Sequence, residues 1–406
     1  MIGVAMSRLT DAVGAASRAA TDAVRELQGA TPAWALAFSG GHHDPATVFG
    51  ILREVLGDIP VYGGSCVGAI TGRELGYSGS EVIVAAFDRQ SGTPRPVRID
   101  GLGTDSLAAG RAMGRALADA LPGGGNVLLF YDSVSPGPAG GLAIGSRFMD
   151  GIYDILPGEQ APTIVGAGLL GDFQLSRSHL FDGRGPARDC ALALVLPDEW
   201  RLTPVVMHGC RPVSSFIEVT RVDGARILEL DHRPATDVLC ERLGLDPQGA
   251  DPVALAFSIL LGRKQGDPFA PFREDRYVNR LIIATDFEAG WVQLFEADLQ
   301  PGDQVQIMAR DPDLMFDSVN SGVSELLARG DTSGMLGLYF DCAGRAGVSA
   351  GTESDEAKVV QQTVGGRVPL LGVYVGRELA PFLGRTRPLD WTGVFIRVDG
   401  GEQSHG

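Results

Sequence analysis

One short pattern occurs three times in this chain and limits how the chain can fold. A proline opens each copy, apolar residues follow and glycines end it, at residues 60–68, 162–171 and 369–376. Each copy predicts a short buried strand that runs into a glycine turn. At such a turn the missing Cβ allows another backbone, or a ligand, to come close.

The order of elements around each copy also repeats. A helical pattern precedes a first strand ending at Phe38, Tyr131 or Phe340, and a second helical pattern leads to the strand that begins with proline. Alternating helices and strands are common to all α/β proteins, but the shared outline favours internal duplication. We therefore predict an α/β fold of repeated helix–strand–helix–strand units forming mixed sheets. Each first strand should share a sheet with its own proline strand, in one connectivity.

The pattern changes between the second and third units. Residues 213–221 and 226–230 flank a turn, and residues 279–286 and 291–296 flank another, which is typical of hairpins. This predicts an antiparallel β insertion. The expected division is an N-terminal helix in 1–28, α/β domains at 29–231 and 232–398, and a disordered tail at 399–406.

Charge and composition exclude several classes of protein. A formal net charge of −16 argues against nucleic acid and anionic membranes as partners. Every apolar run is shorter than the roughly 18 residues of a membrane-spanning helix, and the N-terminus lacks the pattern of a secretory signal. The 5 cysteines are scattered without a C-x-x-C motif, so neither disulfides nor zinc are expected. We expect a soluble cytoplasmic protein without membrane insertion.

Residues 64–68 spell G-x-C-x-G, the pattern of a nucleophile elbow. Such an elbow needs a strand before it, a helix after it and a histidine nearby. The glycine-rich sequence after Gly68 does not favour a helix, so we interpret Cys66 as a small buried residue. A hydrolase using Cys66 remains the enzymatic alternative.

Two groups of histidines are candidate metal or haem ligands. His42 and His43 are adjacent in a predicted turn, and His208 lies two residues from Cys210. Nothing supplies the remaining ligands at zinc spacing, so these are interpreted as polar loop residues. The sequence predicts no metal site, no cofactor and no catalytic residue.

Four motifs together resemble a known family. Residues 37–39 with 61–68 resemble the N-terminal half of the FIST sensory domain, and 209–213 with 219–220 resemble its junction with the C-terminal half. Residues 340–345 and 372–378 resemble the two signatures of the C-terminal half. The motifs occur in family order, and the match runs from about residue 34 to residue 398.

The resemblance implies a ligand-sensing module, with small molecules such as amino acids as ligands and no enzymatic activity. Family members are often fused to kinase, cyclase or chemotaxis output domains, so this chain is expected to signal through a separate output protein. A further branch is implicated in haem-based nitric oxide sensing, which leaves a haem-binding gas sensor as an alternative. Ala69 stands where a glutamate is common, and Asp390 with Trp391 replaces a His-Asn pair.

Strand ends of an open α/β sheet gather in one crevice, where ligands bind. We therefore expect a pocket lined by Ser39, Gly64, Ser65, Asp132, Cys342, Arg345, Gly372 and Glu378. In this hypothesis Arg345 binds the carboxylate of an amino-acid-like ligand, and Glu378 or Asp132 accepts from its ammonium group. The alternative is that Arg345 and Glu378 form a solvated surface pair.

Overall fold

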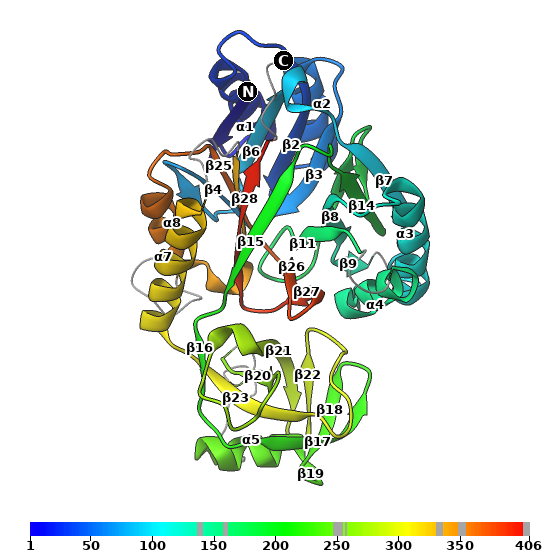
Figure 1. Ribbon diagram of the computed structural model, residues 1–406, viewed down its shortest axis with the longest axis vertical. Helices are drawn as coiled ribbons and strands as arrows, with labels where there is room; N and C mark the ends of the chain where they lie inside the picture. Colours follow the sequence, from blue (N-terminus) through cyan, green and yellow to red (C-terminus); the bar gives the residue numbers. More distant parts are fainter. Residues whose placement is uncertain are drawn as a thin grey trace.

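The computed structural model describes residues 1–135, 141–156, 161–246, 255, 258–329, 336–347 and 355–400. A larger body of three sheets carries helices on its outside, and a smaller β-rich lobe lies beneath it (Figure 1). Residues 401–406 of the expected tail lie outside the described residues. Among the described residues, no helix is both long and apolar enough to cross a bilayer.

The first unit shows how local signals set the elements. It contains β1 (Ile2–Ser7), α1 (Ala12–Glu26), β2 (Pro32–Gly40), α2 (Pro45–Leu56), β3 (Val61–Cys66) and β6 (Val82–Asp88). Asp44 caps α2 by accepting the backbone N–H of Thr47 at 2.8 Å, and proline at the first helical position completes this start signal. The helix expected within residues 1–28 is α1, and the residues before it pair with β6 as β1.

The second and third units repeat this outline. The second contains β7 (Arg95–Asp100), α3 (Ser106–Ala120), β8 (Asn126–Asp132), α4 (Gly145–Ile155), β11 (Thr163–Leu169) and β14 (Cys190–Val195). The third contains β15 (Arg201–Met207), α7 (Pro312–Ala328), β24 (Leu336–Cys342), α8 (Glu356–Val364), β25 (Leu370–Val375) and β28 (Gly393–Asp399). In each unit the first strand pairs in parallel with the proline strand. The predicted α/β fold of repeated units in mixed sheets is therefore confirmed.

Each unit also contributes a hairpin-like pair of strands to the sheet of another unit. These are β4 (Gly68–Thr71) with β5 (Leu75–Gly76), β12 (Leu180–Asp182) with β13 (Pro186–Ala187), and β26 (Arg377–Phe382) with β27 (Arg385–Leu389). β4 leaves the first unit to pair with β25, β12 leaves the second to pair with β3, and β26 leaves the third to pair with β11. The exchange is cyclic, and it completes all three 6-stranded sheets.

Glycines permit the close strand contacts at two equivalent positions. Gly63 and Gly166 have φ angles of 122° and 148°, and a Cβ on either would collide with a carbonyl oxygen of the neighbouring first strand. Next to Gly63, Gly64 likewise faces the carbonyl oxygen of His179 on the incoming segment. The predicted close approach at these glycines is therefore an approach of backbone to backbone.

An aromatic column lies where the three units meet. Phe38, Phe130 and Phe340 occupy equivalent positions on the three first strands, and all are fully buried. The ring centroids of Phe38 and Phe130 are 5.5 Å apart and those of Phe130 and Phe340 are 5.9 Å apart, both edge to face. This geometry is a favourable one for aromatic pairs, so the column joins the three sheets into one core.

The lower lobe is the predicted antiparallel insertion. It contains β16 (Cys210–Pro212), β17 (Ile217–Asp223), β18 (Arg226–Leu230), β19 (Arg233–Pro234), α5 (Ala235–Leu243), β20 (Leu260–Lys264), β21 (Tyr277–Asp286), β22 (Trp291–Leu294) and β23 (Gln304–Arg310). Both expected hairpins are present, as β17 with β18 and β21 with β22. The insertion begins after β15, which already belongs to the third sheet because it pairs with β28.

A short ribbon of β9 (Val134–Ser135) and β10 (Gly141–Leu142) follows β8.

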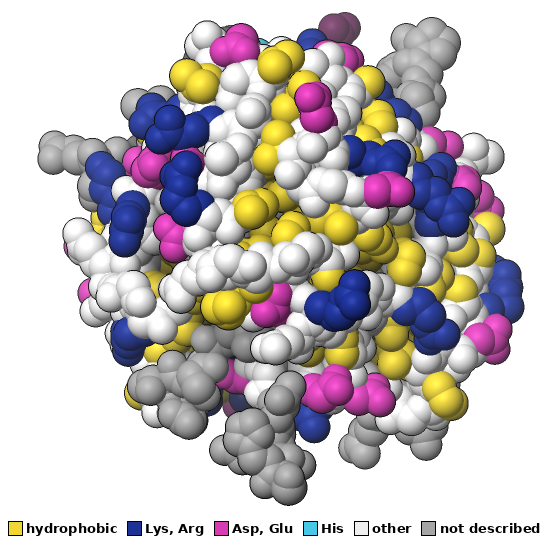
Figure 2. All heavy atoms as spheres, turned by 90° about the horizontal axis from the view of Figure 1, so that it is seen from above, with side chains coloured by type: hydrophobic (Ala, Val, Ile, Leu, Met, Phe, Trp, Pro, Cys, Tyr) yellow, Lys and Arg dark blue, Asp and Glu magenta, His cyan; other side chains and the backbone are white. Residues whose placement is uncertain are grey.

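On the surface, the face of the body in Figure 2 carries basic and acidic side chains next to one another. Neither sign of charge covers that face continuously, although the chain has a formal net charge of −16.

Phe130 contacts both other phenylalanines of the column, so its removal tests whether the column holds the units together. We expect Phe130→Ala to lower the free energy of unfolding by about 3–5 kcal/mol, measured by urea denaturation. Phe269, which is 92% exposed, provides the matched control. Phe269→Ala should change stability by less than about 0.5 kcal/mol, and equal effects of the two substitutions would contradict this role.

Candidate functional site

A cavity of about 370 Å³ opens where strand ends of the body meet the insertion. The segment after β11 supplies Leu170, Phe173 and Leu175. The third unit supplies Cys342, Ala343, Gly344, Gly376 and Trp391, and the insertion supplies Leu281, Phe295 and Arg310. Its wall is therefore mostly apolar and comes from the second unit, the third unit and the insertion.

Arg310 is the charged side chain among the described residues of this wall. Its guanidinium carbon lies 3.4 Å from the ring centroid of Trp391, which is a cation–π contact. Burial lowers the pKa of Arg310 to about 10, so the side chain stays cationic at neutral pH. The positively charged guanidinium of Arg310 thus faces an otherwise apolar cavity, and its stacking on Trp391 fixes its orientation.

Trp391 has an unusual backbone for a large side chain. Its φ angle is +55°, in the left-handed region that bulky residues rarely adopt. Strain of this kind costs on the order of 1–3 kcal/mol and tends to occur at functional sites. The indole N–H of Trp391 is also buried with no hydrogen-bond partner among the described residues. Trp391 therefore combines a strained backbone with an unpartnered buried donor at the cavity wall.

Arg345 holds Trp391 in this conformation. Its Nη1 donates to the carbonyl oxygen of Trp391 at 3.0 Å and to that of His208 at 2.9 Å. Its Nε donates to Glu356 at 3.0 Å, and its Nη2 pairs with the same carboxylate. Although burial opposes the charge, Glu356 and Asp341 hold the pKa of Arg345 well above its ordinary value. The guanidinium predicted to bind a ligand is therefore fully buried and already bound to Glu356.

Glu378 is a buried acid with unused hydrogen-bonding capacity. It lies two residues beyond Gly376 of the cavity wall, is fully buried, and neither carboxylate oxygen has a hydrogen-bond partner among the described residues. Burial raises the pKa of Glu378 well above its usual range, and the charges of Asp341 and Asp390 add to this effect. The structure therefore favours its neutral form.

The cysteine of the cavity is not activated. Burial raises the pKa of Cys342 well above its ordinary value, and the nearby Glu378 raises it further. Cys66 is also buried, with a pKa raised by burial, and strand β4 follows it where a nucleophile elbow requires a helix. Thiolates are the reactive form of cysteine, so neither thiol has the environment of a nucleophile.

The other predicted site residues lie within the body of the protein. Ser65 accepts the backbone N–H of His179 at 3.1 Å, and Asp132 pairs with Arg188 at 3.1 Å. Ser39 is fully buried and its hydroxyl lacks a partner among the described residues. Gly64 and Gly372 lie within β3 and β25. Of the eight predicted residues, only Cys342 is among the described residues that line the cavity.

Sequence reasoning missed the part of the wall that comes from the insertion, including Leu281, Phe295 and Arg310. One signal was available, since Trp391 lies at a position where the chain departs from the family pattern. The histidines considered as ligands make local contacts instead. Nε2 of His43 lies 2.8 Å from the Ser80 carbonyl, and Nε2 of His208 lies 2.8 Å from that of Glu274. No group of three or more metal-ligating side chains occurs in the described part of the chain.

Comparison with models of protein families identifies the family to which this chain belongs. Residues 33–233 match the FIST N domain and residues 235–381 match the FIST C domain. The chain belongs to the FIST family. FIST domains are sensory domains that bind small ligands in signalling proteins, which indicates a signal-sensing role for this FIST protein.

Relatives of this FIST protein occur in mycobacteria. An uncharacterized protein of Mycobacterium tuberculosis is 28% identical over 390 residues, covering 94% of this chain and 95% of the relative. An uncharacterized protein of Mycobacterium bovis is 27% identical over 231 residues, covering 57% of this chain and 58% of the relative. Among solved structures, a chorismatase aligns over 98% of both chains with 12% identity and a TM-score of 0.33.

Loss of the Arg345 guanidinium should destabilise the fold. Removing one partner of a buried ion pair leaves the other charge uncompensated, so Arg345→Ala should lower the free energy of unfolding by about 3–5 kcal/mol in chemical denaturation. Arg329→Ala is the control, because Arg329 pairs with Glu325 at 3.2 Å but is 75% exposed. The control should leave the unfolding midpoint nearly unchanged. A fully stable Arg345→Ala variant would show that the guanidinium is not structural.

Asp390, whose carboxylate accepts the backbone N–H of Leu281 at 3.1 Å, should make the stability of the fold depend on pH. Burial raises the pKa of Asp390 to about 7, although the positive charge of Arg280, whose Nη1 lies 3.9 Å from Oδ2 of Asp390, opposes this shift. The raised pKa means that the folded state favours the neutral form of Asp390. The contribution of Asp390 to the free energy of unfolding is therefore fully present at low pH, and it is lost as pH rises through 7. Relative to Asp390→Asn, the stability of the wild type should fall by roughly 2 kcal/mol between pH 5 and 8.

The comparison with Asp390→Asn isolates this effect from the histidines. Burial lowers the pKa of His179 to about 4, so His179 makes the fold less stable at acid pH, the opposite sign. That contribution is common to both proteins and cancels in the difference. A difference in the free energy of unfolding that stays constant from pH 5 to 8 would contradict the raised pKa of Asp390.

Proposed function

We propose that this FIST protein senses an amino acid with a large apolar side chain, bound in the cavity between the body and the insertion. The observation that carries the proposal is an apolar cavity with one stacked cation on its wall. Its volume of about 370 Å³ falls in the range of roughly 300–1,000 Å³ typical of small-ligand sites.

The wall suggests which part of the ligand lies where. Leu170, Leu281 and Phe295 offer an apolar surface for a large side chain. Arg310 suits the carboxylate, because a guanidinium and a carboxylate form strong charge-assisted hydrogen bonds. Trp391, whose buried indole N–H has no hydrogen-bond partner among the described residues, lines the same wall. Arg310 lines the cavity, whereas Arg345, to which the sequence assigned this role, does not line it and binds Glu356.

Glu378 is proposed as the partner of the ligand ammonium group. An ammonium group near Gly376 would favour the charged form of this acid, and neither of its buried carboxylate oxygens has a hydrogen-bond partner among the described residues. Asp132, the other acid suggested by the sequence, already binds Arg188 and the backbone N–H of Asp189. Glu378 is therefore the better supported acceptor.

The position of the cavity between the body and the insertion suggests how ligand binding produces a signal. The ligand would contact Phe295 of the insertion and Trp391 of the body together, so binding would fix the position of one lobe on the other. We propose that a separate output protein in the cytoplasm detects this change. The wall does not fit a haem, because Cys342 is its one described side chain with an iron-ligating atom, and burial raises the pKa of that thiol.

The proposal is tested by calorimetric titration with phenylalanine, leucine, methionine, glycine and glutamate. The large apolar amino acids should bind and the last two should not. A hydrogen bond to a charged group is worth roughly 1.5–3 kcal/mol, so Arg310→Gln should weaken binding by about tenfold to a hundredfold. Arg221→Gln is the control, since Arg221 is 61% exposed and pairs with Glu229 on the insertion.

Two ligand analogues separate the two polar contacts. Phenylpropanoate lacks the ammonium group, so Glu378→Gln should weaken phenylalanine and leave phenylpropanoate unchanged. Phenethylamine lacks the carboxylate, so Arg310→Gln should leave its binding unchanged. Equal binding of phenylalanine to wild type and Arg310→Gln would overturn the assignment of this cavity.

A further inference from the structure

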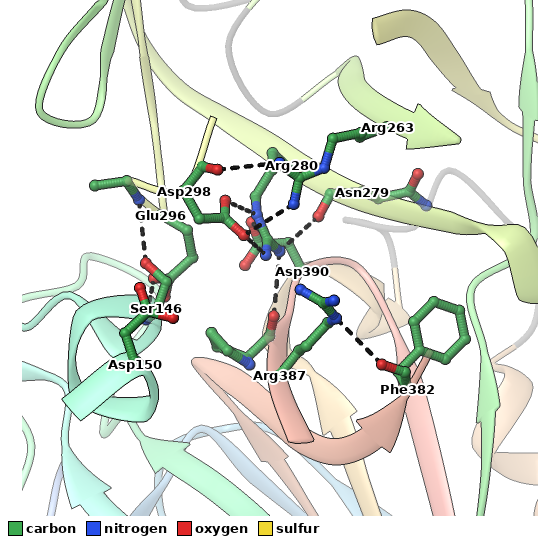
Figure 3. Close-up of polar contacts among 12 residues, drawn as sticks. Ser146, Asp150, Arg263, Asn279, Arg280, Glu296, Asp298, Phe382, Arg387 and Asp390 are labelled. Carbon is green, nitrogen blue, oxygen red and sulfur yellow. Dashed lines mark hydrogen bonds and ion pairs between the residues drawn. The ribbon is translucent and has the colours of Figure 1, made fainter. Parts of the chain in front are cut away.

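A second cavity, of about 630 Å³, lies at another junction between the body and the insertion. Arg147 and Asp150 line it from the start of α4, Arg385 from β27, and Arg263 and Asp303 from the insertion. Figure 3 shows the network beside it, in which side chains of the insertion converge on the hairpin that ends at Asp390. This cleft shares no lining residue with the ligand cavity.

Most charges around the cleft are already paired. Arg385 lies 3.1 Å from Asp150, and Arg263 lies 2.9 Å from Asp303. Arg280 donates through Nε to Asp298 at 2.6 Å and also pairs through Nη2. The three carboxylates nearest to these arginines are therefore each engaged by one of them.

Two arginines at the cleft have no carboxylate partner among the described residues: Arg147, which lines the cleft, and Arg387, which lies beside the lining residue Arg385. Arg387 lies two residues after Arg385, so both project from the same face of β27. Its Nε donates to the Phe382 carbonyl at 3.1 Å, and no carboxylate among the described residues lies within ion-pair distance. Arg147 is exposed and is likewise without a carboxylate partner in the described part of the chain.

The surroundings of Arg387 disfavour an uncompensated charge. Burial lowers the pKa of Arg387 to about 10, and the positive charges of Arg385, Arg263 and Arg280 lower it further. Placing like charges together in a half-buried cleft costs free energy, which a bound anion would offset. Such a cluster is unexpected in a chain whose formal net charge is −16.

We propose that this cleft binds a small multivalent oxyanion, a phosphate or a polycarboxylate, against Arg147 and Arg385 of its wall, with Arg387 beside Arg385 on β27. Planar guanidinium groups suit both chemistries because they donate in pairs to neighbouring oxygen atoms. The anion would join α4 and β27 of the body to the insertion. This inference does not depend on which ligand fills the other cavity.

The test follows thermal unfolding of the full chain in sodium phosphate, in sodium citrate and in sodium chloride at matched ionic strength. We expect phosphate or citrate to raise the unfolding temperature with saturation, and the salt with the lower half-saturation concentration identifies the class of anion. Arg387→Gln should raise that concentration about tenfold or more. Arg147→Gln should act in the same direction, and because this side chain is exposed the variant should fold normally.

Arg18→Gln is the matched control, because Arg18 is 68% exposed on α1 and lies outside the cleft. It should keep the half-saturation concentration of the wild type. Exclusion of phosphate and citrate from protein surfaces also raises unfolding temperatures, but without saturation and in every variant. A non-saturating rise, no rise beyond that in chloride, or an unchanged half-saturation concentration in both Arg147→Gln and Arg387→Gln would overturn the proposal.

Discussion

The architecture depends on the cyclic exchange of strands among the three units. β4, β12 and β26 each leave their own unit and complete the sheet of another, so no unit has a finished sheet by itself. The exchange requires backbones to approach closely, which the glycines at Gly63 and Gly166 permit. It also brings together the end of β24 and the segments that follow β11, β24 and β25, which form most of the body side of the proposed ligand cavity.

Buried charge fixes the insertion on this body. Arg377 of β26 pairs with Glu296, its Nη2 donates to the Phe295 carbonyl at 2.8 Å, and its guanidinium lies over the Phe295 ring. Glu296 also accepts the backbone N–H of Ser146 at 2.7 Å, at the start of α4. Buried ion pairs add little net stability but are costly to break. They therefore define one docked position, which the proposed ligand and the proposed anion would each reinforce.

The sequence allowed the repeated units and the insertion to be predicted, because proline, glycine and alternating apolar residues are local signals. It did not reveal β7, because residues Arg95–Asp100 form an edge strand of mostly exposed side chains. Nor could it show that Glu356 binds Arg345, since spacing along a chain does not indicate which carboxylate a guanidinium meets. The wall around Arg310 was missed for a similar reason, as it forms only when the insertion docks.

The most direct test of the central claim is a crystal structure of the chain with the tightest-binding amino acid of the panel. We predict that the ligand lies between Trp391 and Phe295, with its carboxylate within hydrogen-bonding distance of Arg310. A ligand bound elsewhere on the molecule, with no density in the cavity between the body and the insertion, would contradict this account.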